Sequence, residues 1–206
     1  MIHHRIIHKD TISEEEHCSL VELCADFRNH ENYSDENWQS NPKSLLYKLY
    51  FTDSLHSKNG GLVLVYDDLR LVHIAGFTRS EFHGDIFLGG VRTLTVPKYR
   101  HRLLMSSYSV PMLTAAVIEM GGKMIMYTFD KDKSLYKIFV NKKFNLFLRN
   151  RQTEFDVDTV YGGMQPYEHA VYINYTVQHV LYKYVDTNFN FDWQLIRVQN
   201  DIQNRQ

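Results

Sequence analysis

The chain has 206 residues, of which 44% are hydrophobic, and its 23 Lys and Arg residues nearly balance its 24 Asp and Glu residues. This length predicts one domain with a sizeable core, and the balanced charge argues against a nucleic-acid-binding protein, which needs a basic excess. Cys18 and Cys24 have no partners at metal-ligand spacing and favour a reduced, cytoplasmic protein, and the apolar runs are too short or too interrupted to span a membrane.

The N-terminal part predicts a strand followed by two helices. Residues 4–9 favour a short strand, and residues 12–29 favour an amphipathic helix, with Ser13 as its cap and Glu16 as the second half of a capping box. Both cysteines are expected to pack on or near the apolar stripe of this helix. A polar, acidic loop follows, and Asn41-Pro42 starts the second helix, with proline at a position that needs no amide donor. The stripe of the first helix consists of Leu20, Val21, Leu23, Cys24 and Phe27.

Three strand-like runs form the next part of the chain. Residues 61–66 and 69–78 are separated by Asp67-Asp68, which is a hairpin signal. The third run covers residues 85–96, and Gly89-Gly90 within it predicts a bulge or a close approach of another backbone. We therefore expect a hairpin followed by a third strand.

The middle of the chain predicts a crossover helix. Residues 103–120 repeat apolar side chains at helical spacing, although Pro111 interrupts the pattern. The helix is either kinked at this proline or begins near Ser109 with Pro111 in its first turn. A compact apolar strand at residues 123–129 and a short helix at residues 131–144 follow.

The C-terminal part favours closing strands at residues 144–150 and 169–176. In the tail, residues 179–185 favour another strand and residues 192–203 a terminal helix. Strands and helices alternate only in the second half of the chain. This order predicts an α/β (α+β mixed) fold, in which a central mixed sheet carries helices on both faces.

The segment VPKYRHRLLM, residues 96–105, stands between the third strand and the crossover helix. This is the layout of a loop that holds a pyrophosphate at a helix N-terminus. Such loops usually contain glycine, because backbone amides must approach the phosphate closely. Leu103 and Met105 occupy the places where glycine is expected.

Three consecutive basic residues precede the crossover helix: Arg100, His101 and Arg102. They either supply charge to a 3′-phosphate or pyrophosphate, or they form a solvated basic turn. A helix N-terminus already carries positive partial charge, so additional basic residues there favour a bound anion.

The element order and this segment resemble the GNAT superfamily of N-acetyltransferases. VPKYRHRLLM aligns without gaps on a segment that usually reads Val-Pro-x-Tyr-Arg-Gly-x-Gly, so Arg100 takes the Arg/Gln place. The sequence likeness is concentrated in residues 90–144. The resemblance implies a GNAT-like domain over residues 1–176 and a C-terminal extension, residues 177–206, packed on the same domain.

The resemblance also implies that the chain binds acetyl-CoA or another acyl-CoA as co-substrate. A second family motif, Asn-x-x-Ala-x-x-Leu-Tyr-x-x-x-Gly-Phe, fits DKSLYKIFVNKKF with Asp132 at the Asn and Phe139 at the usual tyrosine acid. This sequence therefore departs from the family at that tyrosine and at the glycines. The cofactor-binding positions carried over are Leu94, Thr95, Val96, Arg100, His101, Arg102, Leu103, Leu104, Met105 and Asp132.

Attack of an amine on acetyl-CoA needs a base for the ammonium, and often an acid for the departing thiolate. His73, on a predicted central strand, is the base candidate, and the alternative is a core histidine with satisfied hydrogen bonds. Tyr127 and Tyr136 are the acid candidates, and the alternative for each is a packing role.

The sequence therefore predicts an acyltransferase that moves an acyl group from acyl-CoA to the amine of a small molecule or peptide. Two alternatives stay open: a GNAT-fold binding or assembly protein without catalysis, and an enzyme of another acyl-CoA reaction. Homo-oligomers are compatible with either. No metal site is predicted, because the N-terminal histidines have no carboxylate or cysteine at ligand spacing. In addition, side chains alternate along a strand, so the neighbouring His3 and His4 would point to opposite faces. The N-terminal histidines are His3, His4 and His8.

Overall fold

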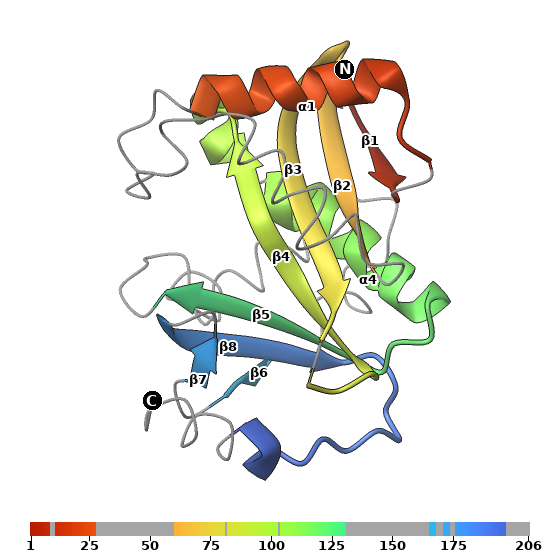
Figure 1. The fold of residues 1–206 in the computed structure, drawn as a ribbon, viewed down its shortest axis with the longest axis vertical. Coiled ribbons are helices and arrows are strands. Elements are labelled where there is room, and N and C mark those ends of the chain that lie inside the picture. Colours follow the sequence, from red (N-terminus) through yellow and green to blue (C-terminus); the bar gives the residue numbers. More distant parts are fainter. Residues whose placement is uncertain are drawn as a thin grey trace. The chain divides into compact units, whose positions relative to one another are not determined.

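The structure is a computed structural model, shown in Figure 1. It describes residues in the N-terminal, central and C-terminal parts of the chain. The predicted second helix, the predicted helix at residues 131–144 and the predicted strand at residues 144–150 lie outside the described residues, as do Leu103, Asp132, Tyr136 and Phe139. The described residues are 1–8, 11–27, 60–80, 82–102, 104–130, 165–167, 171–173 and 176–196.

The chain divides into two compact units. The first unit contains residues Met1–Arg79 and Gly89–Ala116, and the second contains Ser80–Leu88 and Val117–Gln206. One strand and one helix contribute residues to both units. These are β4 (Ile86–Thr95) and α4 (Val110–Glu119).

The sheet of the first unit begins with an antiparallel meander, as Figure 1 shows. β1 (Ile2–Ile7) pairs with β2 (Gly60–Asp67), and β2 pairs with β3 (Arg70–Arg79). The predicted hairpin is confirmed, with Asp68 at its turn in a left-handed conformation of φ 53° that aspartate tolerates better than most residues. β4 follows β3 in strand order.

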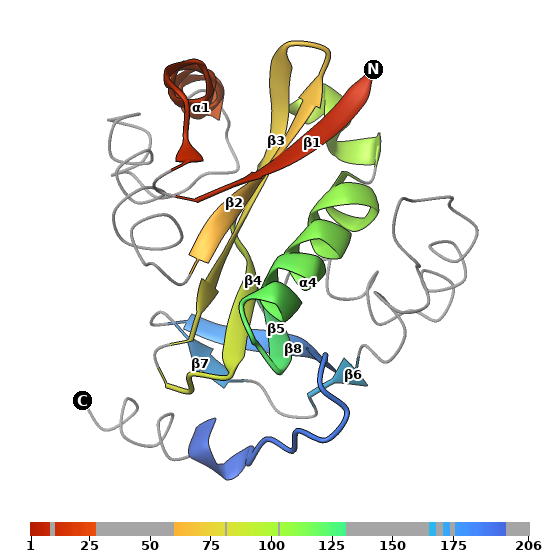
Figure 2. The same cartoon turned by 90° about the vertical axis from the view of Figure 1, so that its right-hand side faces the viewer.

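Helix α1 (Glu14–Phe27) confirms the predicted N-terminal helix and its capping box. The Ser13 amide donates to Glu16 Oε2 at 2.8 Å, and the Glu16 amide donates to Ser13 Oγ at 3.2 Å. Glu16 also pairs with Arg5 of β1 at 2.9 Å, which joins the start of α1 to the sheet. Figure 2 shows α1 on one side of β2 and β3, and the helical run that ends in α4 on the other.

The buried face of α1 is narrower than the apolar stripe that the sequence predicts. Leu20 and Leu23 are buried, but Val21 is 38% exposed and Cys18 is exposed, so the expected packing role of Cys18 is wrong. A helix turns by about 100° per residue, so the side chains on one narrow buried face are three and four residues apart. That face contains buried Glu16 rather than Cys18 or Val21.

The crossover from β4 to β5 (Met124–Asp130) contains a short 3-10 helix, η3 (Pro97–Arg102), and a π-helical turn, η4 (Met105–Ser109), before α4. Pro111 is therefore in the first turn of α4, which confirms the second of the two alternatives. A proline cannot donate to the preceding turn, and a widened turn ahead of it relieves the clash of its ring.

β5 is the neighbour of β4 in strand order. The amides of Lys123 and Met124 both donate to the carbonyl of Asp85, at 2.8 and 3.2 Å. The first residues of the two strands therefore lie side by side, as they do in parallel neighbours that a helical crossover connects.

In the second unit, β5 pairs antiparallel with β8 (Thr176–Tyr184), so the predicted strand in the tail is confirmed. β8 also pairs with β7 (Val171–Ile173), which lies within the strand predicted at residues 169–176, and with the short β6 (Gln165–Pro166). Only β6 was not predicted from the sequence. The strand order β1-β2-β3-β4-β5-β8-β6, with β7 on β8, forms an eight-stranded mixed sheet. The α/β fold class, with a mixed sheet flanked by helices, is confirmed.

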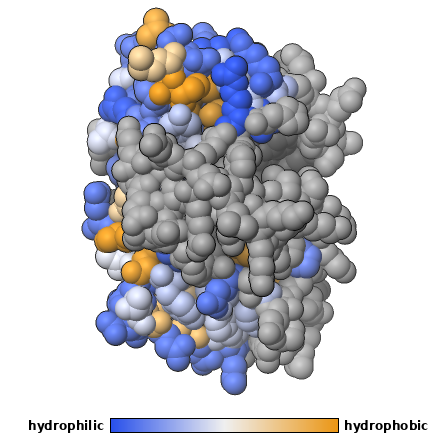
Figure 3. Space-filling model, turned by 180° about the vertical axis from the view of Figure 1, so that it is seen from behind, coloured by the Kyte–Doolittle hydropathy of each residue, from blue (hydrophilic) through white to orange (hydrophobic). Residues whose placement is uncertain are grey.

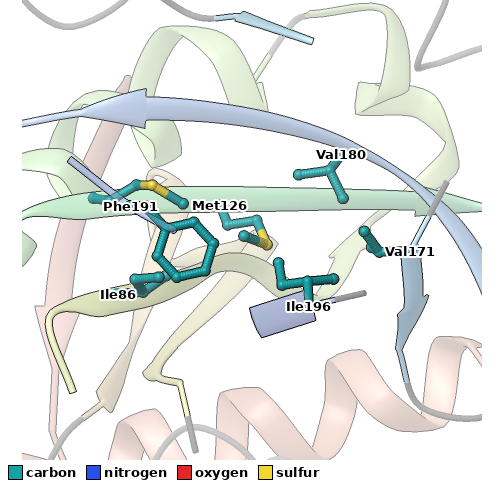
Figure 4. Close-up of a cluster of buried hydrophobic side chains, with 7 residues drawn as sticks. Ile86, Met126, Val171, Val180, Phe191 and Ile196 are labelled. Atoms are coloured by element: carbon teal, nitrogen blue, oxygen red, sulfur yellow. The ribbon is translucent and has the colours of Figure 1, made fainter. Parts of the chain in front are cut away.

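The core of the second unit joins its strands to the residues that follow β8. Figure 4 shows the side chains of this cluster converging from β4, β5, β7, β8 and the tail. Trp193 and Tyr167 are partly buried against this cluster, and their rings stack with centroids 4.1 Å apart. The cluster consists of Ile86, Met124, Met126, Val171, Val180, Phe191 and Ile196.

The surface is mainly hydrophilic where Figure 3 shows described residues, and its apolar side chains gather in small groups. The most exposed large apolar residues of the described chain are Met1 and Leu69, and Met1 lies beside the β2–β3 turn through a backbone hydrogen bond to Asp68. In this part of the chain no helix is long and apolar enough to cross a membrane.

Candidate functional site

The candidate cofactor segment starts at the buried end of β4, in the first unit. Leu94 and Val96 are buried, and the Val96 amide donates to the carbonyl of Val72 on β3 at 2.9 Å. The Tyr99 amide then donates back to Val96 at 2.8 Å, which opens η3. The end of the strand and the start of the loop are therefore fixed against β3.

The described residues of the loop are helical and need no glycine. Leu104 has φ −57° and ψ −38°, and among the described residues only Asp68 combines a side chain with a positive φ. Leu104 is buried and Met105 half-buried without backbone strain. A helical loop also commits amides to its own carbonyls, as Tyr99 does with Val96 and Val110 with Met105. Such amides are not free to bind a phosphate, so side chains must supply more of any anion site.

The basic side chains of the loop lie in different environments. Lys98 and Arg102 both lie against the ring of Tyr99, at 4.9 and 4.8 Å from its centroid. Arg102 is also 4.0 Å from the carboxylate of Asp67. Arg100 is exposed and donates from Nε to the Thr95 carbonyl at 3.4 Å. Arg100 forms no ion pair within the described part of the chain, so no carboxylate there neutralises its charge.

Asp67 was predicted only as a turn residue, but it anchors the loop. The hydroxyl of buried Tyr99 donates to Asp67 Oδ2 at 2.8 Å. This hydrogen bond, followed by one from the Met1 amino group, lowers the pKa of Asp67 below its ordinary value. The two residues are 32 positions apart, and no local sequence pattern reports such a contact.

His73 lies on β3 and is fully buried. Its Nδ1 is 2.7 Å from Thr95 Oγ1, and its Nε2 is 2.8 Å from Ser109 Oγ. Burial lowers the pKa of His73 to about 3, so the ring is neutral at physiological pH. A neutral imidazole donates through one nitrogen and accepts through the other, and both partners are hydroxyls that can take either role. These contacts agree with the core-histidine alternative, and a role for His73 as general base stays a prediction.

The remaining predicted residues belong to the second unit or have side chains outside the described residues. Tyr127 is buried on β5, in the second unit, where its backbone is paired with Leu181. The side chain of His101 lies outside the described residues. No cluster of three or more metal-ligating side chains occurs in the described ranges.

Solved structures place this chain in a known fold. It resembles a GNAT-family protein from Desulfovibrio desulfuricans with a TM-score of 0.58 and 7% identity, over 90% of this chain and 99% of that one. It resembles a spermidine N-acetyltransferase chimera of Vibrio cholerae SpeG and hSSAT with a TM-score of 0.56 and 12% identity, over 89% of this chain and 95% of that one.

YncA from Salmonella typhimurium, solved with its cofactor acetyl-CoA, matches with a TM-score of 0.54 and 6% identity, over 93% of this chain and 98% of that one. No family model and no curated protein matches the sequence. The chain therefore has the fold of the GNAT acetyltransferases, as the segment at residues 96–105 indicated.

Proposed function

We propose that this GNAT-fold protein is an acyl-CoA-dependent N-acyltransferase. The observation that supports this most is the basic loop Pro97–Arg102, which lies between the buried end of β4 and the helical run that leads into α4. The likeness to YncA with acetyl-CoA supports an acyl-CoA co-substrate, and the likeness to a spermidine N-acetyltransferase supports an amine acceptor. The proposal includes a small-molecule or peptide amine as acceptor and a reducing, cytoplasmic location.

In this proposal residues 94–96, at the end of β4, offer backbone groups to the pantetheine arm, residues 100–105 hold the phosphates, and Asp132 of the following segment contacts another part of the cofactor. Because amides of the helical loop are used within the chain, the exposed guanidinium of Arg100 carries most of the electrostatic binding. Arg102 contributes less, since Asp67 and the Tyr99 ring already hold it.

The reaction is a direct transfer. The amine lone pair attacks the thioester carbonyl carbon, the C–S bond breaks, and the electron pair leaves with the CoA sulfur as a thiolate. The ammonium proton goes to a base, and Tyr127 or Tyr136 protonates the thiolate. His73 is the base candidate from the sequence, but its burial, its two hydrogen bonds and its pKa of about 3 oppose that role. A thiol of pKa about 8.5 is a fairly good leaving group, and loss of a general acid costs roughly 10²–10⁴ in rate. With Phe139 at the family's tyrosine position, we expect slow transfer.

Calorimetric titration with acetyl-CoA tests the binding part. Replacing Arg100 and Arg102 with Ala should weaken binding by about 1–3 kcal/mol, the range for charge-assisted hydrogen bonds. Arg79→Ala removes one guanidinium from the first unit at the end of β3 away from Val72, which contacts the loop, and it should leave the affinity within twofold. Absence of binding to wild type at millimolar acetyl-CoA would remove the cofactor role.

A GNAT-fold binding or assembly protein without catalysis is the second candidate. It is favoured by the helical loop, whose amides are committed, and by Arg102, which already has partners. Acetyl transfer to polyamines, amino acids and peptide amines separates the candidates. A tenfold rise in rate with Phe139→Tyr supports the enzyme. If acetyl-CoA binds but neither wild type nor Phe139→Tyr transfers the acetyl group to any of these amines, the transferase assignment is wrong. CoA release without any amine would indicate another acyl-CoA reaction.

A further inference from the structure

His73 contacts both ends of the candidate cofactor loop. Thr95 is the last residue of β4, directly before the loop, and Ser109 is the last residue of η4, directly before α4. The imidazole binds one hydroxyl with each ring nitrogen, at 2.7 and 2.8 Å. All three residues belong to the first unit. One side chain of β3 thereby fixes the distance between the two ends of residues 96–108.

We infer that His73 is a positioning residue, whose two hydrogen bonds hold the ends of the loop in the geometry that receives acyl-CoA. The inference rests on the proposed function for the identity of the ligand. It assigns to His73 no contact with substrate or cofactor.

The surroundings make these bonds hard to replace. His73 and Ser109 are both fully buried, so water cannot substitute for a lost partner. Removing one partner leaves a buried polar atom without a hydrogen bond, which costs more than the bond itself contributes. The hydrogen bonds therefore favour a single arrangement of the loop ends.

The loop has a specific need for this support. In a glycine-rich loop the backbone itself reaches the ligand, but here the chain runs through a 3-10 helix and then a π-helical turn. The π-turn ends at Ser109, two residues before Pro111, which has no amide proton to anchor the turn. The hydrogen bond between His73 and Ser109 supplies an anchor at this point. The Tyr99–Asp67 hydrogen bond fixes the middle of the loop independently.

Hydrogen exchange on the protein without ligand tests the inference first. Three variants remove the bonds: His73→Phe removes both, Thr95→Val removes one, and Ser109→Ala removes the other. Leu64→Ala is the control for general destabilisation, because Leu64 is fully buried on β2 and its backbone pairs with Ile74 rather than with His73. At 25 °C, amides of residues 98–110 should exchange at least tenfold faster in the His73 variant than in the control, while amides of β5 and β8, which carry neither substitution, exchange at similar rates in both.

Binding of acetyl-CoA is the second arm. The dissociation constant should rise at least tenfold in His73→Phe and severalfold in each hydroxyl variant, but not in Leu64→Ala. If His73→Phe does not fold, the two milder hydroxyl variants carry the test. Exchange no faster than in the control, or a faster-exchanging loop with unchanged affinity, would overturn the inference.

The two arms separate this inference from the proposed function. If wild type does not bind acetyl-CoA, the proposed function fails, and the exchange experiment still decides whether His73 orders the loop. Where transfer is measurable, the positioning role predicts a higher KM with a pH–rate profile of unchanged shape. If His73→Phe instead loses one limb of the pH–rate profile, while its acetyl-CoA affinity and the amide exchange of its loop are unchanged, then His73 is the base and the positioning role is refuted.

Discussion

Replacing Gly122 with alanine would place a methyl group where buried atoms already stand. An added Cβ would lie 2.5 Å from Val117 Cγ1 and 2.8 Å from Phe87 Cδ2. Carbon atoms pack best at about 3.5–4.0 Å, so the clash is about 1 Å deep. Both neighbours are fully buried, and the Gly122 amide is held by the Val117 carbonyl at 2.8 Å, so neither the side chains nor the backbone can easily move away.

The expected loss of stability is that of an overpacked core, about 1–3 kcal/mol. For a chain of this size, each kcal/mol lowers Tm by roughly 2–4 °C, so Gly122→Ala should lower Tm by roughly 4–8 °C for a loss near 2 kcal/mol. Gly84→Ala is the matched control, because nothing lies within 4 Å of its added Cβ. Thermal unfolding followed by circular dichroism measures both. Equal Tm values for the two variants would refute the close packing of Phe87 and Val117 around Gly122.

Other features give sharp expectations. Ser13→Ala should lower the unfolding free energy by about 1 kcal/mol in urea, because it removes the cap of α1; an unchanged midpoint would mean that the cap is not needed. Tyr99→Phe removes the hydrogen bond that lowers the pKa of Asp67. A lowered carboxyl pKa stabilises the fold above the unfolded value and loses this effect as the folded group protonates. The difference in unfolding free energy between wild type and Tyr99→Phe should therefore be largest at neutral pH and should disappear as the pH falls below 3.8, the ordinary pKa of the carboxyl. A difference that stays constant down to pH 3 would contradict this. Acetyl-CoA affinity should fall between 0.1 and 1 M NaCl, where the screening length shrinks from about 10 to 3 Å, and it should fall less in Arg100→Ala; equal slopes would argue against a role for Arg100.

The fold was predictable where its signals are local. Ser13 and Glu16 predicted the start of α1, and Asp67-Asp68 predicted the hairpin. Pro111 left two alternatives, a kink or the first turn of a helix, and the structure shows the second. Predictions were weaker where tertiary contacts decide. The width of the buried face of α1 depends on how the sheet meets it, so the exposure of Cys18 and Val21 could not be inferred from helical spacing alone.

The candidate site was predictable as a segment but not as a network. The order of strand, basic turn and helix is continuous in the sequence, and residues 96–105 identified it. The contacts that fix it join residues 22, 32 and 36 positions apart. A buried histidine signals that it needs hydrogen-bond partners, but the sequence does not say which of many hydroxyls supply them. His73 was therefore a base candidate or a core histidine, and only the fold connected it to Thr95 and Ser109.

The helical loop explains how a chain can keep this layout after losing its glycines. Glycine gives a phosphate loop a left-handed or closely approaching backbone, which leucine and methionine cannot adopt without cost. A right-handed helical turn accepts Met105, one of the two residues at the glycine places, without strain, but it turns amides inward and gives up part of the backbone anion site. The loss is offset only if a side chain such as Arg100 faces the ligand and if the loop is held still by other means. The hydroxyl bonds of His73 and the Tyr99–Asp67 contact meet the second requirement, so any anion binding that remains should depend on charge at Arg100 and on order at His73.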